Sequence, residues 1–165
     1  MKIGRLGLLI VTPALFFLPA AAAAAGLFVE GGEGFYRSHN TEAVLIRYQL
    51  EASKLFDQES FYEASYAYWN GSNHDTALSI ARGIRWERTE HDALSLTVGL
   101  GHIDRTTSNL GQPFEFYGHL AYDKPLGPAL FSVGLIHYSD AKFLFRWPGP
   151  NNGENFLTLS LGMNF

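Results

Sequence analysis

The chain has 165 residues, of which 47% are hydrophobic, 15% are aromatic and 17% are charged, and it contains no cysteine. So many aromatic residues and so little charge exclude an intrinsically disordered chain, and the net charge of −4 argues against a nucleic-acid binder. The lack of cysteine excludes a disulfide scaffold and a thiolate zinc site. The length favours a single domain.

The beginning of the chain has the composition of a cleaved secretion signal. Lys2 and Arg5 form a positive start, a largely apolar stretch follows, and a run of alanines ends at Ala25. We therefore predict a signal peptide over residues 1–25 and a mature domain over residues 26–165. The alternative is a retained membrane helix, since the apolar stretch and the alanines together are just long enough to span a bilayer. The alanine run favours cleavage.

The rest of the chain alternates between apolar and polar residues with the period of two that indicates β-strands. In the last segment every second residue from Leu157 to Phe165 is apolar, and the residues between them are small or polar. Eight such segments, bounded by turn residues, are predicted at residues 26–36, 43–55, 60–70, 75–89, 92–104, 113–123, 128–139 and 155–165. An even number of strands of this length is typical of outer-membrane barrels.

The same alternation would also fit a soluble sandwich, in which the apolar faces point inward. Two further features favour a barrel with its apolar face toward lipid. The polar faces carry Gly, Ser and Thr with isolated Glu, Arg and His, which suits a narrow lumen, and the chain ends on Phe165, as chains inserted into the outer membrane usually do. We predict an all-β protein of the bacterial outer membrane, an eight-stranded antiparallel up-and-down transmembrane β-barrel. Its interior is filled by side chains rather than open as in a general porin.

The seventh segment carries two polar residues on an apolar face. His137 and Ser139 continue the alternation of Phe131, Val133 and Leu135, so they are expected to face lipid. Residues two apart on one strand face lie about 6–7 Å from each other, close enough for the hydrogen bond that a serine nucleophile needs from its base. The alternative is that the strand simply ends near the lipid headgroups, where polar residues are common.

The residues around this pair resemble the PagL family, the lipid A 3-O-deacylases of the outer membrane. The resemblance lies in Ile136–Ala141 and Pro150–Asn155, followed by one final strand. It implies a triad on the outer surface of the barrel, with Ser139 as nucleophile, His137 as general base and Glu154 orienting the imidazole. It also implies a lipid A or lipopolysaccharide substrate among outer-membrane lipids and no nucleic-acid partner. No metal or organic cofactor is called for, and a homodimer stays open.

Two departures from the family pattern follow the serine. The family reads His-x-Ser-Asn-Ala-Gly, whereas Asp140 and Lys142 stand here in place of the Asn and the Gly. Asp140 is the candidate for the oxyanion site, and the loss of one oxyanion donor costs about 10²–10³ in rate. The loop that follows is either an aromatic anchor at the membrane interface or a wall of the acyl groove, with Lys142 or Arg146 at a lipid A phosphate.

The position of Glu154 is the weakest part of the implied triad, because strict alternation from Leu157 turns it inward. A bulge or a bend of the loop has to aim its carboxylate at His137.

Two other functions stay open. One is a non-catalytic barrel of the structural or adhesin type, which Asp140 leaves possible. The other is acyl transfer from a phospholipid to lipid A.

Overall fold

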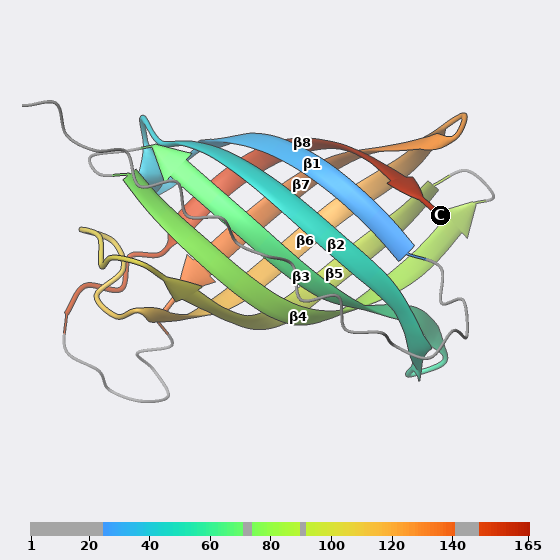
Figure 1. Ribbon diagram of the computed structural model, residues 1–165, viewed down its shortest axis with the longest axis horizontal. Coiled ribbons are helices and arrows are strands. Elements are labelled where there is room, and N and C mark those ends of the chain that lie inside the picture. Colours follow the sequence, from blue (N-terminus) through green and yellow to red (C-terminus); the bar gives the residue numbers. More distant parts are fainter. Residues whose placement is uncertain (1–24, 71–73, 90–91, 141–148) are drawn as a thin grey trace, which may run out of the picture.

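Eight antiparallel strands form a closed barrel in the computed structural model, which describes residues 25–70, 74–89, 92–140 and 149–165 (Figure 1). Each strand pairs with its neighbour in sequence, and β8 pairs with β1 to close the sheet. The strands are β1 (Ala25–Gly34), β2 (Glu42–Leu55), β3 (Gln58–Asn70), β4 (His74–Thr89), β5 (Asp92–Ile103), β6 (Phe114–Leu126), β7 (Ala129–Ser139) and β8 (Glu154–Asn164). The predicted all-β, up-and-down barrel is confirmed.

The predicted strands lie close to those observed, with the largest difference at the end of β6. The prolines of residues 124–128 suggest a turn, but β6 continues through Pro125, which pairs with Leu130 of β7. The chain reverses only at Gly127 and Pro128, where Gly127 has a φ of +63°. A tight two-residue hairpin is therefore enough here, since glycine adopts this left-handed conformation without steric cost.

The connections at the two ends of the barrel differ in length. At one rim, residues 35–41 connect β1 with β2 and residues 104–113 connect β5 with β6, and the first of these connections contains a single turn of 3-10 helix, η1 (Tyr36–Ser38). The end of β7 and the start of β8 lie at the same rim. The other rim carries tight turns and the C-terminal end of β8 (Figure 1). In outer-membrane barrels the longer connections are extracellular. We call this end the loop rim and the other end the turn rim.

The outer face of the barrel is apolar over most of its height. Its exposed side chains include Val29, Val44, Ile46, Leu78, Ile80, Val98, Leu100, Leu157, Leu159 and Leu161. An apolar surface this extensive is unusual on a soluble monomer, and it is the band that a membrane barrel turns toward lipid. In the described part of the chain, no helix is long and apolar enough to cross a membrane.

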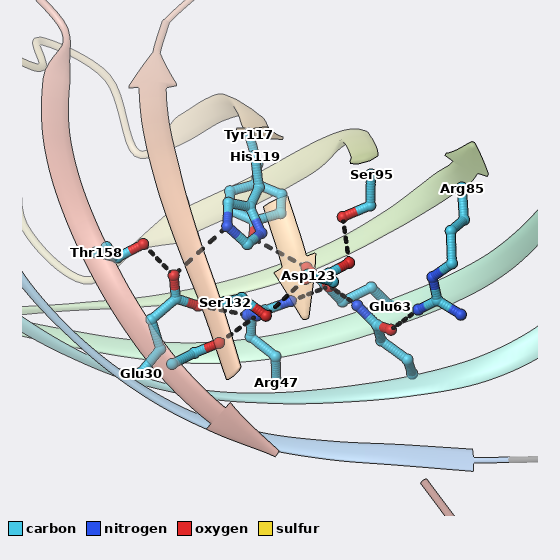
Figure 2. A network of polar contacts seen from close by, with 12 residues as sticks. Glu30, Arg47, Glu63, Arg85, Ser95, Tyr117, His119, Asp123, Ser132 and Thr158 are labelled. Atoms are coloured by element: carbon cyan, nitrogen blue, oxygen red, sulfur yellow. Dashed lines mark hydrogen bonds and ion pairs between the residues drawn. The ribbon is translucent and has the colours of Figure 1, made fainter. Parts of the chain in front are cut away.

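The lumen is filled by a network of charged and polar side chains (Figure 2). Arg47 lies at its centre, 2.5 Å from Glu30 and 3.0 Å from Glu63, and all three side chains are buried. His119 Nε2 lies 3.4 Å from Glu30, and Tyr117 donates a hydrogen bond to Glu63 at 2.9 Å. Because buried charges are costly unless they are paired, this network accounts for the isolated charged residues on the inward faces.

Aromatic residues close the lumen nearer the loop rim. Trp69 packs against Tyr138 and Phe156 at ring-centroid distances of 5.3 and 5.7 Å, and Tyr117 packs against Tyr138 at 5.3 Å. All four side chains are fully buried. Side chains therefore fill the interior, as expected for a barrel of eight strands.

Candidate active site

His137 and Ser139 lie at the end of β7 nearest the loop rim and face outward. Their neighbours Ile136, Tyr138 and Asp140 are buried in the lumen, whereas His137 is exposed and Ser139 is partly exposed. Strand alternation therefore places the imidazole and the hydroxyl on the outer face, as the sequence predicts. No hydrogen bond joins them among the described residues; catalytic hydrogen bonds are often long without substrate and tighten when it binds.

The side chain that holds the imidazole is Asn155 on β8. It is paired with His137 across the sheet, and its Oδ1 lies 2.8 Å from His137 Nδ1. With this oxygen as acceptor, Nδ1 carries the proton and the ring lone pair is on Nε2, the nitrogen that takes the serine proton in serine hydrolases. The sequence does not by itself identify Asn155 as this partner, although Asn155 shares the alternation of the outward residues Leu157 and Leu159.

Glu154 does not orient the imidazole, contrary to what the resemblance implies. It is paired with Tyr138 and is buried in the lumen. Its Oε1 accepts hydrogen bonds from Thr107 Oγ1 at 3.0 Å and from Asn109 Nδ2 at 3.1 Å. The physical reason is that β8 begins at Glu154 without a bulge, so the alternation of the strand turns this residue inward.

Asp140 also points away from the outer face. Its side chain is fully buried in the lumen, and its backbone N–H donates to Asn151 Oδ1 at 3.3 Å. The carboxylate therefore lies on the other side of the sheet from Ser139, so an oxyanion role of Asp140 would fall to its backbone N–H and not to its side chain. Lys142 and Arg146, the candidates for a phosphate contact, lie outside the described residues.

The surface beside His137 is open and apolar. Gly118 of β6 is paired with His137 on the side away from Asn155, and a Cβ at Gly118 would meet no atom nearer than the His137 carbonyl oxygen at 4.0 Å. Toward the turn rim, the outward residues next to the site are Leu135 on β7 and Leu157 on β8, both exposed. The site is thus a pair of polar side chains, His137 and Ser139, at the loop-rim edge of an apolar surface.

Three solved structures resemble this barrel at low sequence identity. The crystal structure of the outer-membrane enzyme PagL matches with a TM-score of 0.71 and 18% identity, covering 84% of this chain and 98% of that one. The N-terminal barrel domain of Pseudomonas aeruginosa OprF matches with a TM-score of 0.62 and 13% identity, covering 87% and 98% of the two chains. Yersinia pestis Ail matches with a TM-score of 0.57 and 10% identity, covering 87% and 99%. At these identities the likeness shows the fold alone.

The sequence itself identifies the family. No curated protein sequence matches the chain at a significant level. The family model for lipid A 3-O-deacylase (PagL), however, matches residues 42–164, which include seven of the eight strands and the whole of the site described above. The chain therefore belongs to the PagL family of lipid A 3-O-deacylases, hydrolases of the bacterial outer membrane.

Proposed function

We propose that this chain removes the 3-O-linked hydroxyacyl chain of lipid A, with Ser139 as nucleophile and His137 as general base. The observation that carries the proposal is the placement of an outward imidazole and hydroxyl, two residues apart, at the lipid-facing edge of the loop rim. Polar groups next to lipid are expensive and generally functional. The hydrogen bond from Nδ1 to Asn155 leaves Nε2 able to accept a proton.

The reaction follows the two steps of a serine hydrolase. Ser139 Oγ attacks the ester carbonyl carbon while His137 Nε2 takes the hydroxyl proton. The bond from that carbon to the sugar oxygen then breaks, and the imidazolium returns the proton to the sugar oxygen. In the second step His137 activates water, which releases the 3-hydroxy fatty acid and restores the Ser139 hydroxyl.

The outer surface of the barrel suits a substrate that is itself a membrane lipid. Leu135 and Leu157 line the wall below the site, so an acyl chain can lie along the barrel without leaving the bilayer. The absent side chain at Gly118 leaves room beside His137 for the ester group. The bulky sugar would then remain at the headgroup level, near the extracellular loops.

The test is the release of free 3-hydroxy fatty acid from lipid A by the purified barrel in detergent. We expect release by the wild type and a fall of about 10³-fold or more in Ser139→Ala and His137→Ala. Ser53→Ala, at the turn rim of β2, is the matched control and should keep full activity. Heat-modifiable migration on gels checks that each variant is folded.

Three outcomes would contradict the proposal. The wild-type barrel could leave lipid A unchanged, as a structural or adhesin-type barrel would. The Ser139→Ala variant could release as much fatty acid as the wild type. Finally, the acyl chain could appear on a second lipid instead of as free acid, which would indicate acyl transfer rather than hydrolysis.

A further inference from the structure

The Nδ1 edge of the His137 ring lies against a short segment of chain that leads into β8. Asn155 Oδ1 is 2.8 Å from Nδ1. Two residues earlier, Gly153 is packed so closely that a Cβ there would lie 2.6 Å from His137 Cε1 and 3.3 Å from Nδ1. This edge of the ring is therefore fixed from two sides, by a hydrogen bond and by backbone packing.

The polypeptide backbone behind Asn155 is also held in place. Its N–H donates to the Oγ of Ser38 at 2.9 Å, and its carbonyl oxygen accepts from the N–H of Phe35 at 3.0 Å. Ser38 is the last residue of η1 and is buried. The connection between β1 and β2 thus anchors Asn155, and Asn155 in turn is hydrogen-bonded to the imidazole.

The carboxylates of the described residues do not take this place. Glu154, the acidic neighbour of Asn155 in sequence, is buried on the other side of the sheet and bonded to Thr107 and Asn109. Asp140 is buried as well. The polar atom on Nδ1 therefore belongs to an uncharged amide.

We propose that Asn155 is the positioning residue for His137, so that this barrel works with a neutral amide where a serine triad commonly has a carboxylate. The inference rests on the function proposed above. The amide selects the Nδ1–H tautomer and fixes the ring, as a carboxylate would. It does not add a negative charge beside the ring, and such a charge within about 4–6 Å favours the protonated form of an imidazole.

This difference has a measurable consequence for the pH dependence of catalysis. A general base works only when it is unprotonated. The fall of kcat/KM at low pH, the acid limb of the pH profile, therefore reports protonation of the base. A carboxylate at residue 155 would favour the protonated imidazole and would move the acid limb to higher pH. The natural amide therefore keeps the enzyme active at a lower pH than a carboxylate would.

The experiment compares kcat/KM for fatty-acid release from lipid A across a range of pH in four variants and the wild type. Asn155→Asp should remain active and move the acid limb upward by about one pH unit. Asn155→Leu, which has nearly the same shape but no polar atom, should lower kcat roughly 10²-fold. Glu154→Gln should leave the acid limb where the wild type has it. Asn164→Asp, which adds the same charge at the far end of β8, should also leave it unchanged.

Different results overturn the inference and the function on which it rests. The positioning role is wrong if Asn155→Leu keeps the kcat of the wild type, or if Asn155→Asp leaves the acid limb in place. It is also wrong if Glu154→Gln shifts the acid limb to lower pH, as the loss of a triad carboxylate would. A wild-type barrel that releases no fatty acid at any pH contradicts the proposed function itself, as does full activity in Ser139→Ala.

Discussion

The two nitrogens of the His137 ring have different surroundings, and this difference defines the chemistry of the site. Nδ1 is hydrogen-bonded to Asn155 and lies against Gly153, whereas no described side chain is hydrogen-bonded to Nε2. General acid–base catalysis depends on a fixed geometry as well as on a suitable proton affinity. The residues that fix the ring are therefore expected to matter as much as the ring itself.

Gly153→Ala tests the packing of the backbone against the imidazole. Gly153 has a φ of +74°, and its new Cβ would meet His137 Cε1 at 2.6 Å and the Tyr138 carbonyl oxygen at 3.2 Å. We expect the ring to be displaced and kcat to fall roughly 10²-fold in a barrel that still folds. Steady-state kinetics with a heat-modifiability gel measures both properties.

Gly127→Ala is the matched control for this substitution. Gly127 has a similar φ of +63°, but a Cβ there meets nothing within 4 Å, and the residue lies in the turn between β6 and β7. Both variants carry the same left-handed strain of about 1–2 kcal/mol, but only Gly153→Ala touches the ring. Equal activity in the two variants would show that the contact with His137 has no role.

At the scale of the strand, the alternation of inward and outward residues explains why the sequence places His137 and Ser139 correctly. It also explains why Glu154, which the resemblance implies as their partner, faces the lumen. The period of two places His137 and Ser139 outward correctly, because it depends only on neighbours along one strand. The same period, continued back from Leu157, puts Asn155 outward and Glu154 inward, as observed. The sequence does not identify the partner of His137, because that partner depends on the register between β7 and β8, which the pattern of one strand does not determine.

Leu159→Lys tests the orientation of β8 in the membrane. Leu159 is exposed near the middle of the strand, where a lysine facing lipid destabilises a barrel by about 2–4 kcal/mol. Met163→Lys, on the same face but at the turn rim, should cost only about 0–1 kcal/mol. Urea unfolding in phospholipid vesicles measures both values. Equal costs at the two depths would contradict a lipid-facing β8.

At the scale of the whole molecule, the closed barrel brings together luminal residues that are far apart in the sequence. Arg47 on β2 contacts Glu30 on β1 and Glu63 on β3, and Glu30 also accepts a hydrogen bond from Thr158 on β8. The sequence predicts that these residues face inward. It does not predict their partners, because the contact between Glu30 and Thr158 forms only once β8 pairs with β1.

Arg47→Met tests how far this network stabilises the barrel. The substitution leaves Glu30 and Glu63 buried without their shared cation, which typically costs about 3–5 kcal/mol. Arg88→Met, an exposed position on β4, should change the free energy of unfolding by less than about 0.5 kcal/mol. The free energy of unfolding of each variant is measured in vesicles by tryptophan fluorescence. A small effect in Arg47→Met would show that the network contributes little.

The most direct measurement is the mass of lipid A from bacteria that express this chain, compared with bacteria that express Ser139→Ala at the same level in the outer membrane. The account predicts that the wild type yields lipid A lighter by one 3-hydroxyacyl chain, with the matching free acid, and that the variant yields full-length lipid A. Unchanged lipid A in wild-type cells with a folded barrel, or the same mass loss in the Ser139→Ala cells, would contradict it.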